Sequence, residues 1–270
     1  MVIKQNKGYK LPMSKIQIIK SYLLGISCYQ IAKICNCSPQ AIYAILKSTN
    51  TPRRSLSKAA TKYTHDKKFF QKIDTEEKAY FLGLLYADGN VSKNVLSISL
   101  QEQDRSILDK LKNALSYTGP ITPITKKDKR KQQWKLAITS KELIISLLTH
   151  GLYPNKGTTL KFPDTVPSFL LVHFIRGYFD GDGCIYTNFK NHDYLFSIVA
   201  PQNFLLKIQE LMIKDLSLTK TKLYNPKNCK DTQLHILTYQ GRKNLLRIRD
   251  WLYKDANIYL SRKKDKFFII

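Results

Sequence analysis

The feature that most constrains this chain is a nine-residue motif that occurs twice. The two copies are FLGLLYADG at residues 81–89 and IRGYFDGDG at residues 175–183. Asp88 and Asp182 hold the same place in the two copies and lie 94 residues apart. Each copy ends an apolar run on a carboxylate followed by glycine. An internal repeat of this kind indicates a fold built from two similar halves.

The sequence that follows the motif is duplicated as well. Alternating residues predict a strand after each copy, LSISL at 96–100 and FSIVA at 196–200. The offset between these strands is 100 rather than 94, so the first hairpin of the second copy is six residues longer. A helix follows each strand, with Asp104 and Asn203 as the expected caps, and then two more strands and an apolar helix. The order helix, two strands, helix, two strands, helix therefore occurs twice, which predicts an α+β fold with pseudo-twofold symmetry.

Cap signals predict where the two motif helices begin and end. Asp74 with Glu77 three residues later is a capping-box pattern, and Ser168 is the expected cap of the second helix. Gly89 and Gly183 are expected to end the helices in the left-handed conformation. The motif carboxylates then lie in the last helical turn, at the negative end of the helix dipole.

Each motif helix also carries two small residues four positions apart, Gly83 with Ala87 and Gly177 with Gly181. Positions four apart share one face of a helix. Glycine inside a helix costs about 1 kcal/mol relative to alanine, so it is favoured where two backbones must approach closely. We therefore predict that the two motif helices pack against each other along these residues.

This packing would bring Asp88 and Asp182 together. Two carboxylates about 4 Å apart repel by about 4 kcal/mol at an effective dielectric constant near 20. A hard divalent cation reverses the sign of that interaction, and carboxylate with carbonyl oxygen suits Mg²⁺. The sequence thus predicts a shared metal site where the helices meet.

The charge of the chain favours a polyanionic partner. Its 270 residues include 45 Lys and Arg against 20 Asp and Glu, a formal net charge of +25. The basic residues are interleaved with Tyr, Phe, Gln and Asn along the whole length rather than gathered in one block. This distribution favours nucleic acid as the partner over a basic but merely soluble protein.

Other compositional features exclude several classes of protein. No apolar stretch approaches the roughly 20 residues that span a bilayer, and the N-terminal residues lack the apolar core of a signal peptide. The five Cys form no CxxC pair and their number is odd, which indicates neither a zinc site nor a disulfide framework. An intracellular location without a secretion signal is expected.

The segment 14–48 predicts three short helices, the third with Ser38 as its N-cap and Pro39 at its first position. Two short helices joined by a tight turn resemble a helix-turn-helix of the kind found in resolvases. Any small helical bundle is the alternative. The third helix would read the major groove, and the arginines after it would contact phosphates or the minor groove; the residues concerned are Gln40, Tyr43, Ala44, Lys47, Arg53 and Arg54.

At the residues of the two nonamers the chain resembles the LAGLIDADG homing endonucleases of the single-chain, two-motif type. The resemblance extends from Asp74 to the C-terminus, and its double occurrence with matched flanks makes it specific. It implies the homing-endonuclease fold, in which two saddle-shaped antiparallel sheets lie in the DNA major groove. The implied activity is Mg²⁺-dependent, site-specific hydrolysis of double-stranded DNA. The implied protein is a monomer with a long, non-palindromic target, in a prokaryote, a phage-infected cell or an organelle.

The expected domains follow from these patterns. A helix-turn-helix domain occupies residues 1–54, and a polar, poorly periodic linker occupies 55–72. The first repeat spans residues 73–160 and the second spans 161–270.

The resemblance also implies roles for single residues. Asp88 and Asp182 would be the catalytic metal ligands, one for each strand cut, helped by the carbonyl groups of Ala87 and Gly181. Bound Mg²⁺ would activate water and stabilise the leaving oxygen.

The chain departs from the family pattern at one motif position. The first Asp of the motif is Tyr86 in the first copy, while the second copy keeps Asp180. That position is structural in the family, so we do not interpret Tyr86 as inactivating.

The family places a basic residue where the last strand of each repeat meets its helix. Lys141 stands there in the first copy, and Gln240 stands there in the second, with Lys243 nearby. The two half-sites would then differ chemically. The plain alternative for Lys141 is a solvated lysine near a helix start.

Contacts to DNA are expected from the outer faces of the strands and from the hairpins. Leu96, Ile98 and Leu100 alternate towards the core, so the residues between them face the groove. The predicted contacts are Ser97, Ser99, Gln101, Lys127, Lys129, Arg130, Lys131, Gln133, Asn188, Lys190, Lys222, Tyr224 and Lys243.

Two alternative functions stay open at this point. The scaffold could serve as a DNA-binding regulator that has lost cleavage, although the presence of both motif carboxylates argues against it. It could also serve as an intron maturase that binds RNA. An intein is disfavoured, because the sequence lacks the terminal His-Asn that splicing chemistry needs.

Overall fold

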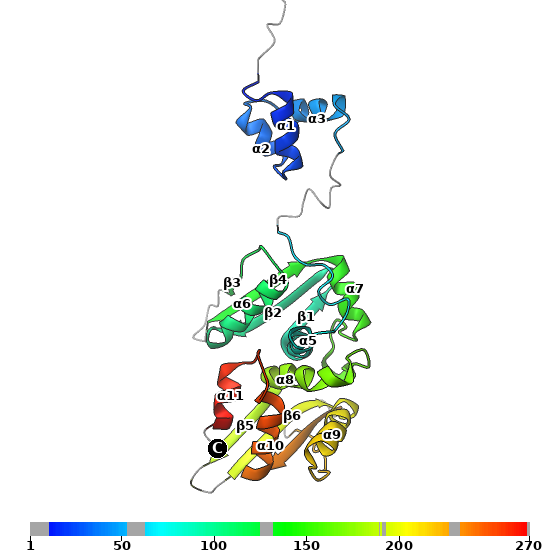
Figure 1. The fold of residues 1–270 in the computed structure, drawn as a ribbon, viewed down its shortest axis with the longest axis vertical. Helices are drawn as coiled ribbons and strands as arrows, with labels where there is room; N and C mark the ends of the chain where they lie inside the picture. Colours follow the sequence, from blue (N-terminus) through cyan, green and yellow to red (C-terminus); the bar gives the residue numbers. More distant parts are fainter. Residues whose placement is uncertain are drawn as a thin grey trace, which may run out of the picture. The chain divides into compact units, whose positions relative to one another are not determined.

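The computed structural model describes residues 11–52, 63–124, 132–188, 190, 193–226 and 233–268. The chain forms two compact units, Met1–Lys62 and Tyr63–Ile270 (Figure 1). The boundary between the units lies inside the stretch expected to be a linker. No helix in the described part of the chain has the length and apolar character that a bilayer span needs.

The N-terminal unit consists of three short helices, α1 (Lys15–Leu23), α2 (Cys28–Ile34) and α3 (Pro39–Ser48). Capping boxes begin the first two, and Ser38 accepts a hydrogen bond from the backbone N–H of Ala41 to begin the third. The three predicted helices and the Ser38–Pro39 start are therefore confirmed. The helices enclose a small core made of Ile18, Tyr22, Cys28, Ile31, Ala32, Cys35, Ile42 and Leu46.

The larger unit contains the two predicted repeats in sequence order. The first repeat comprises α5 (Glu76–Asp88), β1 (Gly89–Ser92), β2 (Val95–Gln101), η1 (Glu102–Asp104), α6 (Arg105–Ala114), β3 (Thr122–Ile124), β4 (Gln133–Thr139) and α7 (Lys141–Thr149). The 3₁₀ turn η2 (Gly157–Thr159) closes the first repeat. The second comprises η3 (Ser168–Leu170), α8 (Leu171–Asp182), β5 (Gly183–Asn188), β6 (Asp193–Pro201), α9 (Gln202–Leu216), β7 (Leu234–Gln240), α10 (Arg242–Tyr253) and α11 (Ser261–Phe268). The predicted element order is confirmed for the first repeat. In the second, β7 is the one strand between α9 and α10 among the described residues, and α11 is an addition.

Each repeat forms one antiparallel sheet. The strand orders are β1-β2-β4-β3 and β5-β6-β7. Gly89 pairs with Ile98 in the first sheet, and Gly183 pairs with Ile198 in the second. This matched register confirms the longer first hairpin of the second repeat. In the described residues, the fourth strand of the second sheet is reduced to a single bridge between Tyr224 and Ile236.

Strand alternation agrees with the prediction on the core side of the first sheet. Leu96, Ile98 and Leu100 are buried. On the other face Ser99 is half-buried and Gln101 is exposed. Ser97 is only 7% exposed, so its expected exposure to a groove is wrong. Ser97 is a small residue on the central strand β2, and it is flanked by Asn90 on one side and Ala137 on the other.

Several predicted helix starts are shifted by one to three residues. Thr75 caps α5 by accepting from the N–H of Lys78, whereas Asp74 forms an ion pair with the Lys78 side chain at 2.7 Å. The predicted capping box of Asp74 with Glu77 is therefore wrong. Ser168 lies in the 3₁₀ turn η3, and α8 starts three residues later, after Leu170.

The caps of α6 and α9 also differ from the prediction. Asp104 precedes α6, but its carboxylate binds Arg262 instead of capping the helix. Asn203 is already inside α9, which begins after Pro201. Boundaries of this kind depend on which of several adjacent polar groups finds a tertiary partner.

The glycines after the motif carboxylates are extended rather than left-handed, with φ of −73° at Gly89 and −79° at Gly183. Both residues start a strand directly, which requires extended backbone. Glycine is nevertheless needed there, because a Cβ on Gly89 would lie 2.5 Å from the carbonyl oxygen of Leu85, and one on Gly183 would overlap the Phe179 ring.

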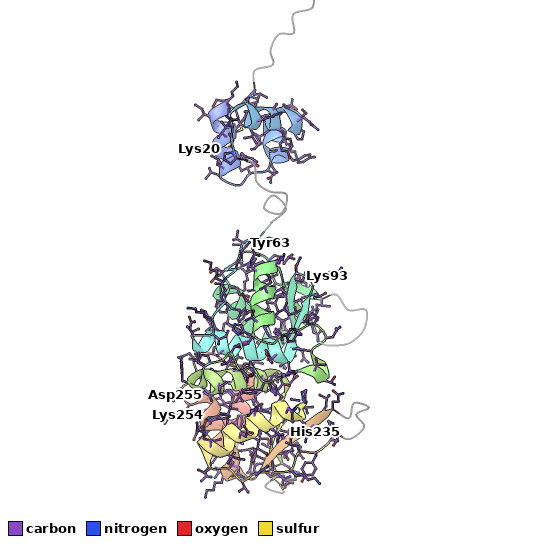
Figure 2. All side chains as sticks on the ribbon, turned by 90° about the vertical axis from the view of Figure 1, so that its right-hand side faces the viewer. Lys20, Tyr63, Lys93, His235, Lys254 and Asp255 are labelled. Carbon is purple, nitrogen blue, oxygen red and sulfur yellow. The ribbon has the colours of Figure 1, made fainter. Side chains whose placement is uncertain are left out.

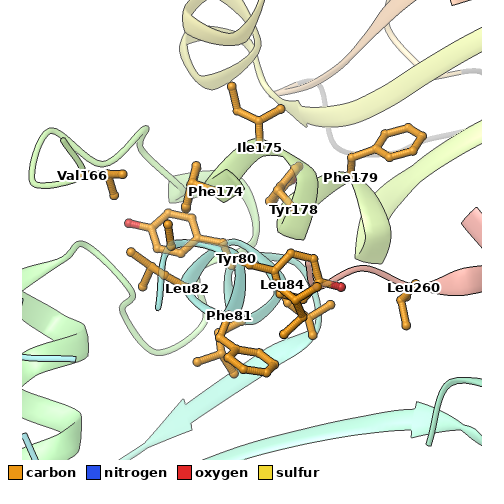
Figure 3. Close-up of a cluster of buried hydrophobic side chains, with 14 of the residues drawn as sticks. Tyr80, Phe81, Leu82, Leu84, Val166, Phe174, Ile175, Tyr178, Phe179 and Leu260 are labelled. Atoms are coloured by element: carbon orange, nitrogen blue, oxygen red, sulfur yellow. The ribbon is translucent and has the colours of Figure 1, made fainter. Parts of the chain in front are cut away.

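The two motif helices pack against each other at the centre of the larger unit (Figures 1 and 3). A Cβ on Gly83 would lie 2.0 Å from the carbonyl oxygen of Phe174, and one on Gly177 would lie 2.0 Å from that of Tyr80. Tyr80 and Phe174 are themselves 94 positions apart, so the two contacts are related by the repeat. The predicted glycine-mediated pairing of the helices and its pseudo-twofold symmetry are confirmed.

Candidate active site

The paired helices bring their C-terminal ends together. Asp88 is the last residue of α5 and Asp182 is the last residue of α8. A Cβ on Gly181 would lie 2.3 Å from the Cβ of Ala87 and 2.9 Å from Oδ2 of Asp88. The Asp88 carboxylate therefore lies against the backbone next to Asp182, as the small residues predicted.

The surroundings of both carboxylates disfavour their charge. Asp88 and Asp182 are open to solvent, yet protein atoms surround them on most sides. This desolvation, together with the charge of Asp182, raises the pKa of Asp88 to about 6. Desolvation also raises the pKa of Asp182. Both carboxylates lie at the negative ends of helix dipoles, which adds to the cost of their charge. The site is therefore suited to a cation.

Two lysines lie at this site that were not assigned to it from the sequence. The first is Lys156, in the segment after α7. Its ammonium group donates to the carbonyl oxygens of Leu85 at 2.7 Å and Ala87 at 2.8 Å, and also to that of Tyr86. Desolvation lowers the pKa of Lys156 to about 8, although Asp182 and Asp88 act in the opposite direction. A positive charge at the C-terminal end of α5 is favourable because it interacts with the helix dipole.

The second lysine is Lys263, in α11. Its ammonium group donates to the carbonyl oxygen of Gly183, directly after α8, and lies 5.3 Å from the centre of the Phe179 ring. Desolvation lowers the pKa of Lys263. Each motif helix thus ends beside one buried or half-buried lysine. The sequence signal for both is their similar position, shortly after α7 in the first repeat and shortly after α10 in the second.

The structure corrects the assignment of Lys141 to this site. Ile98 pairs with both Gly89 and Leu136, so Leu136 marks the level of the carboxylates on β4. Thr139 lies three residues further along, about 10 Å at the usual rise of a strand. Lys141 lies beyond it, is exposed, and begins α7 at the end of the sheet away from Asp88.

The same register argument removes Gln240 from the site. Leu237 is level with Gly183 through Ile198. Gln240 is three residues further along β7, again about 10 Å away, and is exposed. The basic groups beside the carboxylates come from the segments after the last helices, not from the strand ends.

The motif position that differs between the copies has a structural role in both. The Asp180 carboxylate is fully buried and accepts hydrogen bonds from Tyr80 Oη at 2.8 Å, Tyr253 Oη at 2.5 Å and the N–H of Leu260 at 2.7 Å. In the first copy the Tyr86 hydroxyl donates to the carbonyl oxygen of His150. Both residues tie a motif helix to the chain that follows the last helix of its repeat, which supports the interpretation that Tyr86 does not inactivate the site.

The donor set fits a hard divalent cation. Among the described residues no group of three or more His, Cys, Asp and Glu could hold a metal ion. An ion would therefore depend on the carboxylates of Asp88 and Asp182 and on backbone carbonyl groups, an all-oxygen set that suits Mg²⁺. The carbonyl group of Ala87 accepts from Lys156, and its second lone pair remains compatible with a ligand role.

The predicted DNA contacts are distributed over both units. In the N-terminal unit Gln40, Tyr43 and Lys47 are exposed along α3. In the larger unit the exposed or half-buried members are Ser99, Gln101, Gln133, Asn188, Lys190, Lys222, Tyr224 and Lys243. Arg53, Arg54, Lys127, Lys129, Arg130 and Lys131 lie outside the described residues. Side chains project from the surfaces of both units, including Lys20 on one and Lys93 and Lys254 on the other (Figure 2).

Comparison with known families and proteins adds a second line of evidence. The family model described as LAGLIDADG-like domain matches residues 75–150 and 170–251. The chain is 28% identical over 204 residues to a probable translation initiation factor IF-2 of Methanocaldococcus jannaschii, covering 70% of this chain but only 16% of that protein. It is 23% identical over 267 residues to an uncharacterized protein of the same organism, covering 96% of this chain and 79% of that protein.

Solved structures with a similar fold are also found. The I-LtrWI LAGLIDADG homing endonuclease bound to target DNA is 12% identical, with 75% of this chain and 90% of that chain covered at a TM-score of 0.46. I-SmaMI bound to an uncleaved DNA target in the presence of calcium ions is 14% identical, with 71% and 89% covered at a TM-score of 0.45.

Proposed function

We propose, from the premise that this chain belongs to the LAGLIDADG-like domain family, that it is a site-specific double-stranded DNA endonuclease. The observation that carries the proposal is the convergence of Asp88 and Asp182 at the ends of two abutting helices. Both carboxylates are open to solvent, and a lysine lies beside each helix end. With the lysines beside them, these carboxylates can bind a divalent cation next to the phosphates of a polyanion.

The residues of the site would have different roles in phosphodiester hydrolysis. Asp88 and Asp182 would hold divalent metal, with help from the carbonyl groups of Ala87 and Gly181. Bound Mg²⁺ would supply an activated water and stabilise the leaving oxygen. The ammonium groups of Lys156 and Lys263 add positive charge beside the scissile phosphates, where charge develops during cleavage.

DNA binding would use both units of the chain. The formal net charge of +25 favours contact with phosphates. The outer faces of the two sheets would lie in the major groove, and α3 would act as the recognition helix of a helix-turn-helix. The halves differ in hairpin length and at the Tyr86 and Asp180 positions, which favours a long, non-palindromic target. Both carboxylates come from one chain, which favours a monomer.

The proposal is tested by cleavage of a plasmid library that carries randomised target sites. Wild-type protein with Mg²⁺ should cut both strands of the selected site, and EDTA should stop it. Asp182→Asn should keep its affinity for that site and fail to cut at least one strand. The exposed variant Asp109→Asn on α6 is the matched control and should cut normally.

The same experiment distinguishes other functions of this scaffold. Sequence-specific binding without any cleavage in Mg²⁺ would indicate a regulator. Stronger binding to structured RNA than to the selected duplex would indicate a maturase. Full cleavage by Asp182→Asn would remove this carboxylate from the reaction.

A further inference from the structure

An ion pair links the C-terminal helix α11 to the opposite repeat, in addition to the hydrogen bonds from Asn257, before this helix, to Glu76. Nε of Arg262 lies 2.8 Å from Oδ1 and 2.7 Å from Oδ2 of Asp104. The Asp104 side chain is 5% exposed and that of Arg262 is 34% exposed. Asp104 closes the 3₁₀ turn between β2 and α6 of the first repeat, whereas Arg262 lies in α11, after α10 of the second. The pair therefore links the two halves of the larger unit.

The residue next to Arg262 is the lysine of the second half-site. Arg262 and Lys263 occupy adjacent positions in the first turn of α11, and their side chains are fixed on different partners. Lys263 donates to the carbonyl oxygen of Gly183, while Arg262 holds Asp104. Further along, Phe267 is buried against the rings of Phe179 and Tyr253, with centroids 6.0 and 5.6 Å away. Phe267 fixes the end of α11. Its first turn is held by the Arg262 contact together with the hydrogen bond from the N–H of Leu260 to Asp180 just before it.

The corresponding junction of the second repeat is built differently. Where β6 runs into α9, Gln202 and Asn203 line a cavity of about 520 Å³. Its other wall includes Thr158, Thr159 and Lys161, from the segment that carries Lys156. In the described residues, an ion pair joins the segment that carries Lys263 to the opposite repeat. The segment that carries Lys156 faces an open cavity at the matching junction. Within the described part of the chain, the Asp104–Arg262 ion pair therefore belongs to the Lys263 side alone.

We propose that Asp104 is a positioning residue for Lys263. Through Arg262 it holds the first turn of α11 at the C-terminal end of α8. One half-site thereby depends on a residue that the other repeat supplies. This inference rests on the proposed endonuclease function and assigns Asp104 to one of its two strand cleavages. Asp104 touches no reacting group in this role.

The test is cleavage of a target duplex with a different label on each strand. Lys263→Met first identifies the strand whose cleavage depends on Lys263. Asp104→Asn keeps the size of the side chain and removes its charge. It should slow cleavage of that same strand by about tenfold to about a hundredfold, the range expected for a misplaced active-site group. The other strand should stay within about twofold, so that nicked DNA accumulates. Asp104→Glu should restore much of the rate.

Two controls separate positioning from general damage to the fold. Asn203→Ala, at the junction that has the open cavity, should leave both strand rates within about twofold. Thermal unfolding and DNA affinity should be similar for Asp104→Asn and wild type. If Asp104→Asn does not fold, Arg262→Lys keeps the positive charge, removes the two-oxygen contact through Nε, and should slow the same strand.

The inference is overturned if Asp104→Asn slows both strands equally, slows neither, or slows the strand that does not depend on Lys263. Failure of the proposed function looks different, because wild-type protein would then cut neither strand in Mg²⁺.

Discussion

Asp88 and Asp182 lie at the paired helix ends, where their negative charge is unfavourable unless a metal cation is bound. The pKa of Asp88 is raised to about 6, first by the protein around it and then by Asp182. An unperturbed Asp has a pKa near 3.9. Between about pH 4 and about pH 6 the folded protein therefore binds more protons here than the unfolded chain. Folding stability from this group decreases as pH rises through that range and stays lower above it.

Replacing Asp88 with Asn should remove this cost in metal-free protein. Because the carboxylate is open to solvent, the expected gain at pH 7 is about 1 kcal/mol in the free energy of unfolding, well below the full pKa difference. The gain should be smaller at pH 4. Chemical denaturation in EDTA at both pH values measures it.

Divalent metal should reverse the order of stability of wild type and Asp88→Asn. Mg²⁺ or Ca²⁺ should stabilise wild type and have little effect on Asp88→Asn, because binding to the folded state raises stability. The exposed variant Asp109→Asn is the control and should change stability by less than about 0.5 kcal/mol. A loss of stability in Asp88→Asn at pH 7 would show that its charge is already compensated without metal.

The sequence predicted the carboxylates but not the lysines, for a physical reason. Asp88 and Asp182 lie in a motif whose spacing is local, so helix geometry alone places them. Lys156 lies after α7 and Lys263 lies after α10, and only the tertiary path of those segments carries them back to the motif helices. The family resemblance implies Lys141 at the site, whereas the register of β4 places it at the far end of the sheet.

At the scale of elements, α5 and α8 are the pair that positions the site. Their contact depends on glycine at two repeat-related positions, where a side chain would meet backbone rather than a flexible neighbour. The tyrosines and phenylalanines on either side of the contact are buried in the same core (Figure 3). The separation of the helices is therefore fixed by backbone contact.

Gly83→Ala or Gly177→Ala should lower the free energy of unfolding by about 2 to 3 kcal/mol, because each added Cβ overlaps a carbonyl oxygen of the facing helix. Gly157→Ala is the matched control, since its Cβ would meet open space among the described residues. Chemical denaturation of the three variants in EDTA measures the difference. Equal stability of all three would mean that α5 and α8 can separate at no cost.

The elements were more predictable than their ends. Period and repetition predicted the order of helices and strands except for the fourth strand of the second sheet, and Leu96, Ile98 and Leu100 point inward as alternation requires. The predicted starts of α5 and α8 were wrong, because Thr75 caps α5 and the turn η3 precedes α8. The predicted left-handed conformation of Gly89 was wrong, because β1 begins at Gly89 itself. Rules for helix caps do not consider a strand that follows the helix directly.

On the scale of the whole molecule, a basic three-helix unit is joined to a duplicated unit that contains both carboxylates. Each unit has its own core. Composition predicted the polyanionic partner, and local periodicity predicted the two units. The asymmetry between the halves, with an ion pair on one side and a cavity on the other, depends on contacts between segments far apart in the sequence and could not be predicted.

Removing residues 1–62 should weaken DNA binding more than it slows cleavage at saturating protein. Each phosphate contact contributes about −0.9 to the slope of log affinity against log salt. The slope of the shortened protein should therefore be shallower by at least about 2, if the three-helix unit contacts two or more phosphates. Binding measured across a salt series gives both numbers. Unchanged affinity and slope would make the N-terminal unit irrelevant to DNA binding.

The most direct measurement of the central claim is anomalous diffraction from crystals of the protein grown with Mn²⁺. A peak is expected between the Asp88 and Asp182 carboxylates, about 2.0 to 2.3 Å from their oxygens, as for small hard divalent cations. The peak should disappear in Asp88→Asn with Asp182→Asn. Mn²⁺ bound elsewhere on a protein that still cleaves DNA, with nothing between these two carboxylates, would contradict the shared metal site.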